Sequence, residues 1–208
     1  MKQSSQLSKI KWVRHGFYNA IDSQTVKHPL LMNQVHSADV LFVQNSWDEL
    51  PQVDALVTKT KGLVLTVKTA DCAPVLIADT KSQIIAAIHA GWKGAFQGII
   101  EATVLKMMEK GALLENLVAA VGPHIQKKSF QADEKMKTLF PVTEHHFFEP
   151  TENGYLFDFD GYVLHRLRRA GIQKIDTLLD DTFPDETYYS FRRDPSNPAR
   201  QYSVIELI

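Results

Sequence analysis

The sequence predicts a mixed α and β protein in which helices cover a large, mostly buried sheet. Short runs of Val, Ile and Leu fill the middle of the chain, and the spacing of apolar residues then changes to that of helices. The 208 residues are 44% hydrophobic and 23% charged, which is ordinary for a globular protein. This length suits one domain, so we expect residues 1–208 to form a single domain that needs no structural metal to fold.

The predicted strands come first along the chain. Residues 1–30 are too mixed to predict an element. Strands are predicted at residues 30–35 and 40–43, and a loop or short helix at residues 44–52. Further runs lack polar alternation, which is typical of strands that are buried on both faces. These runs occupy residues 55–58, 63–69, 74–78, 84–89 and 117–121.

The predicted helices follow. Over residues 96–108 the apolar side chains recur at positions that form one face of a helix, and Gly111 is well placed as its C-terminal cap. Two further helices are predicted near residues 132–139 and 160–170. The tail, residues 188–208, predicts two strands around a loop rich in Arg, Asp, Pro and Asn.

The charge balance argues against nucleic acid and membranes as partners. Lys and Arg total 23 and Asp and Glu total 24, which gives a net charge of −1 without a long basic run. Binding a nucleic acid requires a concentrated positive surface, and spanning a bilayer requires about 20 consecutive apolar residues. The single cysteine, Cys72, allows no intramolecular disulfide, and the N-terminus has no apolar signal core, so we expect a cytoplasmic protein.

Two histidines and the cysteine are the strongest candidates for chemistry. His89 ends an apolar strand and precedes a glycine-containing turn and a helix, a position where ligands meet the end of a sheet. Cys72 lies in a polar break beside Asp71, and His36 ends a short strand among polar residues. Imidazole and thiolate are zinc ligands, and three of them leave the open position at which a catalytic zinc binds water. Their spacing along the chain is too wide to be diagnostic by itself.

The same side chains also suit nucleophilic catalysis, with Cys72 as a thiolate and His89 or His36 as its base. His124, which follows Gly-Pro, is a candidate for either role. Nearer the C-terminus, the run Tyr-Ser-Phe-Arg-Arg at 189–193 places two cations beside a hydroxyl. Such a run suits a phosphate site and suits a solvated surface turn equally well. The residues alone leave these alternatives open.

The order of these motifs resembles that of the YfiH-like, laccase-domain family. The resemblance extends from Leu31 to the C-terminus. It rests on Gln-Val-His at 34–36, Asp-Ala-Leu-Val-Thr at 54–58, Thr-Ala-Asp-Cys-Ala-Pro at 69–74, His-Ala-Gly-Trp-Lys-Gly at 89–94, Gly-Pro at 122–123 and Tyr-Ser-Phe-Arg-Arg at 189–193. Members are known as polyphenol oxidases, as peptidoglycan editing factors, and as purine nucleoside phosphorylases with adenosine deaminase activity.

The resemblance implies a fold, a cofactor and a reaction. The fold would be an α/β/β/α sandwich, and the cofactor would be zinc held by His36, Cys72 and His89. The reactions would be phosphorolysis of adenosine, inosine and methylthioadenosine, and hydrolytic deamination of adenosine. The partners would then be a small nucleoside and phosphate, and the chain would act as a monomer or homodimer.

We also expect particular residues to serve the substrate. Asp71 would carry a proton or hold a zinc-bound histidine in place, as a carboxylate behind a metal ligand often does. Cations and polar groups near the motifs would bind phosphate and nucleoside. These are Gln34, Lys93, Ser190, Arg192 and Arg193.

Three departures from the family pattern bear on the substrate pocket. Lys93 stands where the family usually has Arg, which keeps the charge but loses the bidentate geometry. The glycine-rich N-terminal segment of the family is short here, within residues 1–30, and a cysteine common before the late Arg-Arg motif is replaced around Asp181 and Thr182. We therefore expect the metal ligands to be preserved and part of the pocket to be rebuilt.

Two other functions compete with the phosphorylase. A Cys-His hydrolase that edits a peptidoglycan precursor would use Cys72 as its nucleophile, and a metal-bearing binding module would hold a ligand without turnover. The two enzymes differ at Cys72, because a metal-bound thiolate resists alkylation and a free one reacts quickly. Multicopper laccase chemistry is not expected, because it needs many histidines around several metals and the 8 histidines here are scattered.

Overall fold

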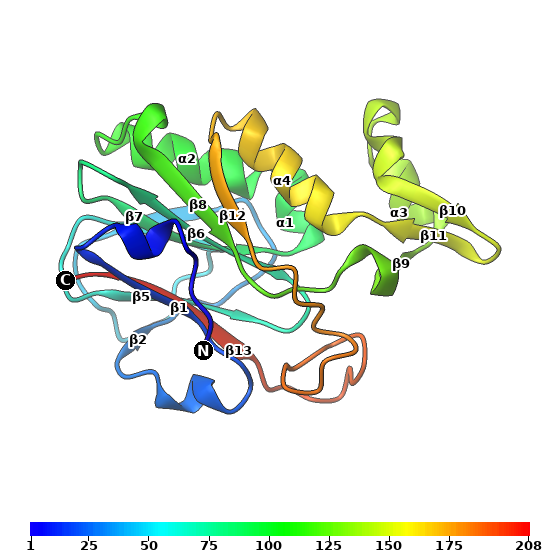
Figure 1. Ribbon diagram of the computed structural model, residues 1–208, viewed down its shortest axis with the longest axis horizontal. Helices are drawn as coiled ribbons and strands as arrows, with labels where there is room; N and C mark the ends of the chain where they lie inside the picture. Colours follow the sequence, from blue (N-terminus) through cyan, green and yellow to red (C-terminus); the bar gives the residue numbers. More distant parts are fainter.

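The computed structural model describes all 208 residues and contains two stacked β-sheets with helices on one side (Figure 1). The larger sheet has six strands in the order β12-β8-β6-β7-β4-β3. Its central strands, β6 (Ala73–Asp79) and β7 (Ile85–Ala90), pair antiparallel and are buried along their whole length. The others are β3 (Val40–Val43), β4 (Ala55–Thr58), β8 (Leu117–Val121) and β12 (Lys174–Thr177). The unbroken apolar runs thus form buried strands, as predicted.

The smaller sheet packs against one face of the larger one. Its strands are β1 (Val13–Phe17), β2 (Pro29–Leu30), β5 (Val64–Thr69) and β13 (Gln201–Leu207), in the order β1-β13-β5-β2. The C-terminal strand β13 lies between β1 and β5, so segments from both ends of the chain belong to one sheet (Figure 1).

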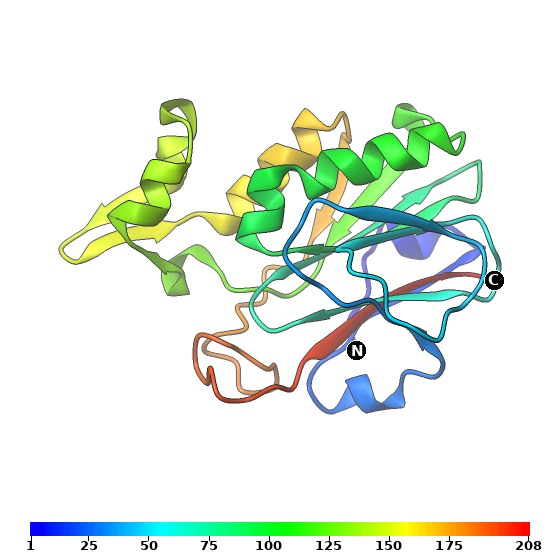
Figure 2. The same cartoon turned by 180° about the vertical axis from the view of Figure 1, so that it is seen from behind.

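Three helices cover the other face of the six-stranded sheet (Figures 1 and 2): α1 (Trp92–Gln97), α2 (Ile99–Glu109) and α4 (Phe159–Arg169). The single helix predicted to begin at Phe96 is in fact two helices. Gly98 adopts a left-handed φ of 97°, which ends α1 and starts α2. None of the helices has the length and apolar character needed to cross a membrane.

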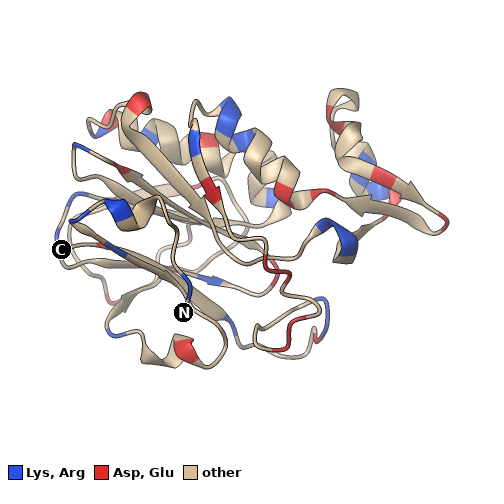
Figure 3. Cartoon of the chain, viewed as in Figure 1, with Lys and Arg blue, Asp and Glu red and all other residues tan.

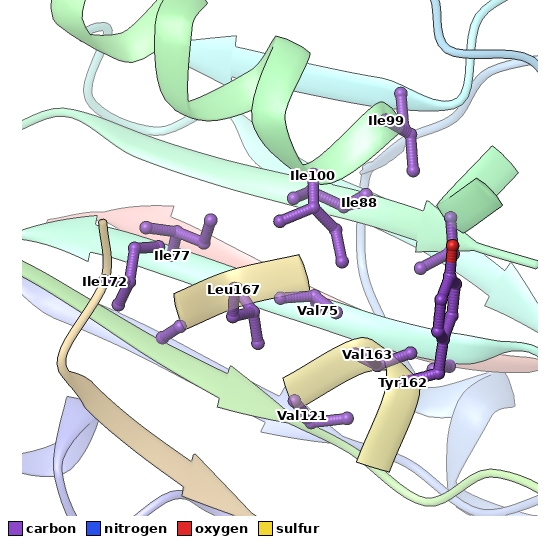
Figure 4. Packing of buried hydrophobic residues seen from close by; sticks show 14 of the residues in the cluster. Val75, Ile77, Ile88, Ile99, Ile100, Val121, Tyr162, Val163, Leu167 and Ile172 are labelled. Atoms are coloured by element: carbon purple, nitrogen blue, oxygen red, sulfur yellow. The ribbon is translucent and has the colours of Figure 1, made fainter. Parts of the chain in front are cut away.

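Side-chain alternation along β6 divides the core between these layers. Leu76 and Ala78 belong to the hydrophobic cluster between the two sheets, whereas Val75 and Ile77 belong to the cluster under the helices. Figure 4 shows Val75 and Ile77 packed near Leu167 of α4. The strand β6 therefore contributes to both cores.

A small lobe, residues 130–157, projects from this body, and we call it the arm (Figure 2). It holds a three-stranded sheet and one helix: β9 (Gln131–Ala132), α3 (Glu134–Leu139), β10 (Phe148–Thr151) and β11 (Gly154–Phe157). The ring centroid of Phe140 lies 4.9 Å from that of Phe96 on α1 and 5.2 Å from that of Tyr162 on α4. These aromatic contacts join the arm to the core under the helices.

The mixed α and β class is confirmed, and the α/β/β part of the expected sandwich is complete. The second helical layer, expected on the outer side of the four-stranded sheet, is reduced to one 3-10 helix at Asp22–Thr25. The reason is that the segment between β1 and β2 is short (Figure 1). The remaining 3-10 helices are Leu7–Lys9, Leu114–Asn116, Lys127–Ser129 and Val142–Phe147.

The predicted strands near the two ends were wrong in part. The strand expected at 30–35 is only β2, because the next residues form a loop in which the side chain of Gln34 bonds to the backbone of Lys68. The tail contains one strand, β13, because residues 188–200 form a loop whose backbone at Tyr189 bonds to the side chain of Gln201. The strands β1 and β12 were not predicted, since they are short and include polar residues.

Replacing Ile77 with alanine is expected to lower the free energy of unfolding by roughly 2–5 kcal/mol, because this side chain is fully buried between β6 and the helices. Urea denaturation followed by circular dichroism measures the change. Leu105, which is 58% exposed on α2, is the matched control, and its alanine variant should change stability by less than about 0.5 kcal/mol. Equal losses in the two variants would contradict this placement of the core.

Candidate metal centre

Three side chains from separate segments converge at one end of the six-stranded sheet. His36 lies in the loop before β3, Cys72 lies between β5 and β6, and His89 lies near the end of β7. Their possible ligand atoms all lie within 4.8 Å of one another. Sγ of Cys72 is 3.8 Å from Nε2 of His36, and the two imidazole rings meet edge to face with centroids 4.8 Å apart. The structure thus brings together the three predicted ligands, which we call the trio.

Strand pairing and one glycine explain this convergence. Pro74 on β6 lies opposite His89 on β7, which brings the nearby Cys72 beside that histidine. Gly91 then leaves space for the third ligand, because a Cβ at this position would lie 2.6 Å from Cδ2 of His36 and 3.3 Å from Sγ of Cys72. A residue with a side chain at position 91 would push the trio apart.

A buried carboxylate orients two members of the trio. Asp54, fully buried just before β4, lies 2.7 Å from Nδ1 of His89, which donates to it. The same carboxylate accepts hydrogen bonds from the loop that carries His36: from the backbone N–H groups of Val35, His36 and Ser37 and from the hydroxyl of Ser37, at 3.2, 3.0, 2.7 and 3.0 Å. These bonds hold His36 at a φ of 62°, a conformation that residues with side chains rarely adopt. The bond between Asp54 and Nδ1 leaves Nε2 as the ring nitrogen of His89 that can face a metal.

The electrostatics of the trio favour ionised sulfur. Burial is the largest influence on Cys72 and acts to raise its pKa, but the charge of His89 and the hydrogen bonds from both histidines outweigh it and lower the pKa to about 6. Burial acts to lower the pKa of His89, but the charge of Cys72 and the bond to Asp54 raise it to about 9. Without a metal, the pair is therefore a thiolate and an imidazolium near neutral pH.

The trio fits a divalent transition metal. One thiolate and two imidazoles are ligands that zinc accepts, and a carboxylate behind a ligating histidine is its common outer partner. His36 is exposed and Cys72 is half-buried, so the trio opens to solvent on one side. Three protein ligands with an open side are typical of catalytic zinc sites, whereas structural sites are closed by four.

Asp71 does not hold a histidine, contrary to one of the predicted roles; Asp54 does. The carboxylate of Asp71 instead accepts hydrogen bonds from the hydroxyl of Thr182 at 2.7 Å, the hydroxyl of Ser190 at 3.0 Å and the backbone N–H of Arg192 at 2.7 Å. These bonds also stabilise its own left-handed φ of 82°. Asp71 therefore fixes the loop of residues 188–200, which we call the C-terminal loop, beside the trio.

A cleft of about 1080 Å³ lies over the trio. Its walls come from the ends of both sheets, α1, the arm and the C-terminal loop, and its aromatic side chains are Trp92, Phe130, Phe159 and Phe191. Its cations are Lys68, Lys93, Arg192 and Arg200, and none of these forms an ion pair. Elsewhere on the chain, basic and acidic segments are interspersed (Figure 3). The cleft therefore offers unpaired positive charge to an anion.

The residues predicted to bind substrate divide into two groups. Gln34, Lys93 and Arg192 line the cleft. Ser190 and Arg193 do not, and their polar groups instead tie the 188–200 loop to neighbouring segments. The guanidinium of Arg193 donates to the backbone carbonyls of Thr182, Phe183 and Tyr188, and the hydroxyl of Ser190 donates to Asp71. We therefore reassign Ser190 and Arg193 to holding the loop that presents Arg192.

His124 lies outside both the trio and the cleft. It is fully buried, with Nδ1 2.8 Å from the carbonyl of Gly122 and Nε2 3.5 Å from Asp160. Burial lowers its pKa, so it is neutral near physiological pH. It is thus a core histidine and not a ligand or base of this site.

Sequence reasoning missed Asp54, Lys68 and Arg200. A signal was present only for Asp54, an acid directly before a strand that is buried on both faces. Lys68 and Arg200 could not be assigned, because a cation on a strand or directly before one is usually a solvated surface residue.

The fold and the site together define a class: a two-sheet α/β protein with an open Cys-His-His centre in a cleft. The chain belongs to the YfiH-like laccase-domain family, since the family described as multi-copper polyphenol oxidoreductase laccase matches residues 6–208.

Known relatives agree with this assignment. A purine nucleoside phosphorylase of Rickettsia prowazekii is 37% identical over 169 residues, which is 79% of this chain and 70% of the relative. The purine nucleoside phosphorylase YfiH of Shigella flexneri is 33% identical over 184 residues, covering 86% and 74% of the two chains. Among solved structures, Neisseria meningitidis protein NMB0706 superposes with a TM-score of 0.81 at 29% identity, covering 90% of this chain and 78% of that one.

Proposed function

We propose that this chain is a zinc-dependent purine nucleoside phosphorylase that acts on adenosine, inosine and methylthioadenosine and also deaminates adenosine. One observation carries the proposal: the open trio and a set of unpaired cations face the same cleft. Relatives at 33–37% identity that are named purine nucleoside phosphorylases support it.

In this proposal Lys93 and Arg192 bind the phosphate. Phosphorolysis forms a bond between a phosphate oxygen and C1′ of the ribose while the bond from C1′ to the purine nitrogen breaks. Charge-assisted hydrogen bonds from two cations would hold the phosphate for this attack. Two contacts fix the position of Arg192 in the cleft. Its backbone N–H donates to Asp71, and its guanidinium lies 5.4 Å from the ring centre of Phe130.

The purine would lie between the trio and the aromatic side chains. Trp92 and Phe130 line the cleft, and aromatic side chains of this kind would contact a planar base there. Zinc in the trio would supply a Lewis acid that activates water for the deamination of adenosine. Asp54 would keep the His89 ring in the orientation that this requires.

The chain offers a mononuclear centre. The trio is the single group of three or more His, Cys, Asp or Glu side chains close enough to share a metal ion. A multicopper oxidase needs several such groups. This favours the phosphorylase over the oxidase chemistry in the family's description.

The remaining proposals concern location and assembly. A thiolate ligand is stable in a reducing compartment, which is why we propose the cytoplasm. We propose that residues 1–208 act as one domain, as a monomer or homodimer, on small molecules.

Alkylation of Cys72 separates the metal ligand from a free nucleophile of a Cys-His hydrolase. In the metal-free protein, the rate of reaction with iodoacetamide should rise as the pH increases through about 6, where the thiol ionises. One equivalent of zinc should then slow the alkylation at least about tenfold at neutral pH, because the metal is bound to the sulfur of Cys72. Mass spectrometry measures both rates. Rapid alkylation that zinc leaves unchanged would favour the hydrolase.

The direct test of the proposed reaction is chromatography with mass detection. The zinc-loaded protein is incubated with adenosine, with and without phosphate, beside a Cys72→Ala control. Adenine and ribose 1-phosphate should form only with phosphate, and inosine should form in both cases. No product above the control would overturn the proposed activity on adenosine.

A further inference from the structure

Two cations of the cleft form a local pair on the four-stranded sheet. Lys68 lies on β5, and Arg200 directly precedes β13. The two strands are antiparallel, and Lys68 pairs with Tyr202, two residues beyond Arg200. Such diagonal neighbours have Cα atoms roughly 7–8 Å apart and share a face, which is within reach of long side chains. Both line the cleft, so an anion there could contact both.

This pair lies where β5 and β13 meet, on a different element from Lys93 and at the opposite end of the 188–200 loop from Arg192. Leu65 and Val67 face the core between the sheets, so alternation turns Lys68 to the opposite face of β5. That face is the one beyond which the 3-10 helix Asp22–Thr25 lies (Figure 1). Lys93 and Arg192 instead come from α1 and from the loop bonded to Asp71, next to the trio.

The protein itself does not neutralise these charges. The ammonium of Lys68 has no ion-pair or hydrogen-bond partner, since only its backbone bonds to Gln34. The guanidinium of Arg200 donates to the carbonyls of Asn197 and Ala199 and meets no carboxylate. The acidic side chains of the cleft are Asp71 and Asp133, and both bond to groups other than these cations. Asp71 accepts three hydrogen bonds, and Asp133 caps α3 by accepting a hydrogen bond of 2.8 Å from the backbone N–H of Met136.

We propose that Lys68 and Arg200 bind a phosphate ester on the 5′ carbon of the nucleoside, so that the chain prefers purine nucleoside 5′-monophosphates. The nucleoside part of this inference rests on the proposed function. Inorganic phosphate carries up to about two negative charges, and a phosphate ester on the nucleoside adds about two more. One pair of cations, Lys93 and Arg192, would then bind the inorganic phosphate, and the other pair would bind the ester. The volume of the cleft, about 1080 Å³, is slightly above the roughly 300–1000 Å³ of small-molecule sites, so the cleft has room for the larger ligand.

Calorimetric titration of the zinc-loaded full chain tests the inference without turnover. Inosine, inosine 5′-monophosphate and inorganic phosphate are titrated separately at low salt. The monophosphate should bind about tenfold more tightly than inosine, as expected for hydrogen bonds between charged groups. In the double variant Lys68→Gln/Arg200→Gln this ratio should fall to within about twofold of unity. A Lys61→Gln/Lys81→Gln variant, which loses the same charge on exposed turns away from the cleft, should keep the ratio.

The outcomes separate this inference from the proposed function. A ratio near unity in the unmodified chain, a ratio that the Lys68 and Arg200 substitutions leave unchanged, or no measurable binding of either ligand would overturn it. An equal loss of inorganic phosphate and monophosphate binding in the double variant would also overturn it, because the pair would then be the inorganic phosphate site. A tenfold ratio without phosphorolysis would leave the ester site standing and remove the proposed reaction.

Discussion

Replacing Cys72 with alanine is expected to abolish metal binding and product formation while leaving the fold intact. The thiolate is one of three protein ligands, so its loss should weaken metal binding by more than the roughly 10–100-fold typical of losing an outer partner. Cys72 is half-buried and belongs to neither hydrophobic cluster, so the metal-free variant should stay folded, with its unfolding temperature lowered only by the loss of the interaction between the thiolate and His89. Competition with a chromophoric chelator measures the affinity, and chromatography measures the product.

Thr69→Ala is the matched control for this variant. Thr69 lies three residues before Cys72 in the same motif, is buried, and its hydroxyl has no hydrogen-bond partner. Removing that hydroxyl should leave metal affinity and turnover within about twofold of the parent. A Cys72→Ala variant that still binds one zinc per chain with unchanged affinity would show that the trio is not the metal site.

The Asp54→Asn variant should bind the metal roughly 10–100-fold more weakly, although Asp54 touches no metal ligand atom. The substitution keeps the shape of the side chain but removes the charge that accepts hydrogen bonds from His89 and from the loop of His36. Chelator competition measures the affinity. Asp39→Asn is the control, because Asp39 is exposed two residues beyond Ser37 and its carboxylate has no partner, so its affinity should match that of the parent. Equal affinities for the parent and the Asp54→Asn variant would contradict the orienting role of Asp54.

The stability of this variant should also depend on pH in a defined direction. Burial acts to raise the pKa of Asp54, but the bonds from His89 and Ser37 outweigh it and leave the pKa below its usual value. The carboxylate therefore stabilises the fold fully above the unfolded pKa of about 3.9, and this contribution is lost as the pH falls further. Thermal unfolding of the metal-free proteins should show a difference between parent and variant at neutral pH that narrows below about pH 4. A difference that stays constant on acidification would contradict this.

The parts of the fold that the sequence predicted are those with one strong local signal. The strands β3, β4, β6, β7 and β8 consist mostly of apolar residues, and this local signal is what predicted them. The arm and β1 could not be predicted, because their short strands depend on partners distant in sequence, such as the pairing of Val13 with Leu207. The break at Gly98 was missed because a glycine inside a helical pattern is often tolerated.

The sequence predicted the three ligands of the candidate site but not the residue that orients two of them. The trio was found because His36, Cys72 and His89 lie in motifs, and the structure brings their ligand atoms together. The carboxylate that orients the two histidines was not predicted, because the sequence does not show which side chains a carboxylate contacts in the folded chain. Asp54 and Asp71 look alike in sequence, yet one holds the trio and the other holds the C-terminal loop.

The central claim is that one metal ion in the trio supports the proposed reaction. The most direct measurement is the rate of inosine phosphorolysis as metal-free protein is titrated with zinc. The account predicts negligible product without zinc and a linear rise that ends at one zinc per chain, which is the capacity of the single ligand group. Full turnover in the metal-free protein, or a rate that keeps rising beyond one equivalent, would contradict it.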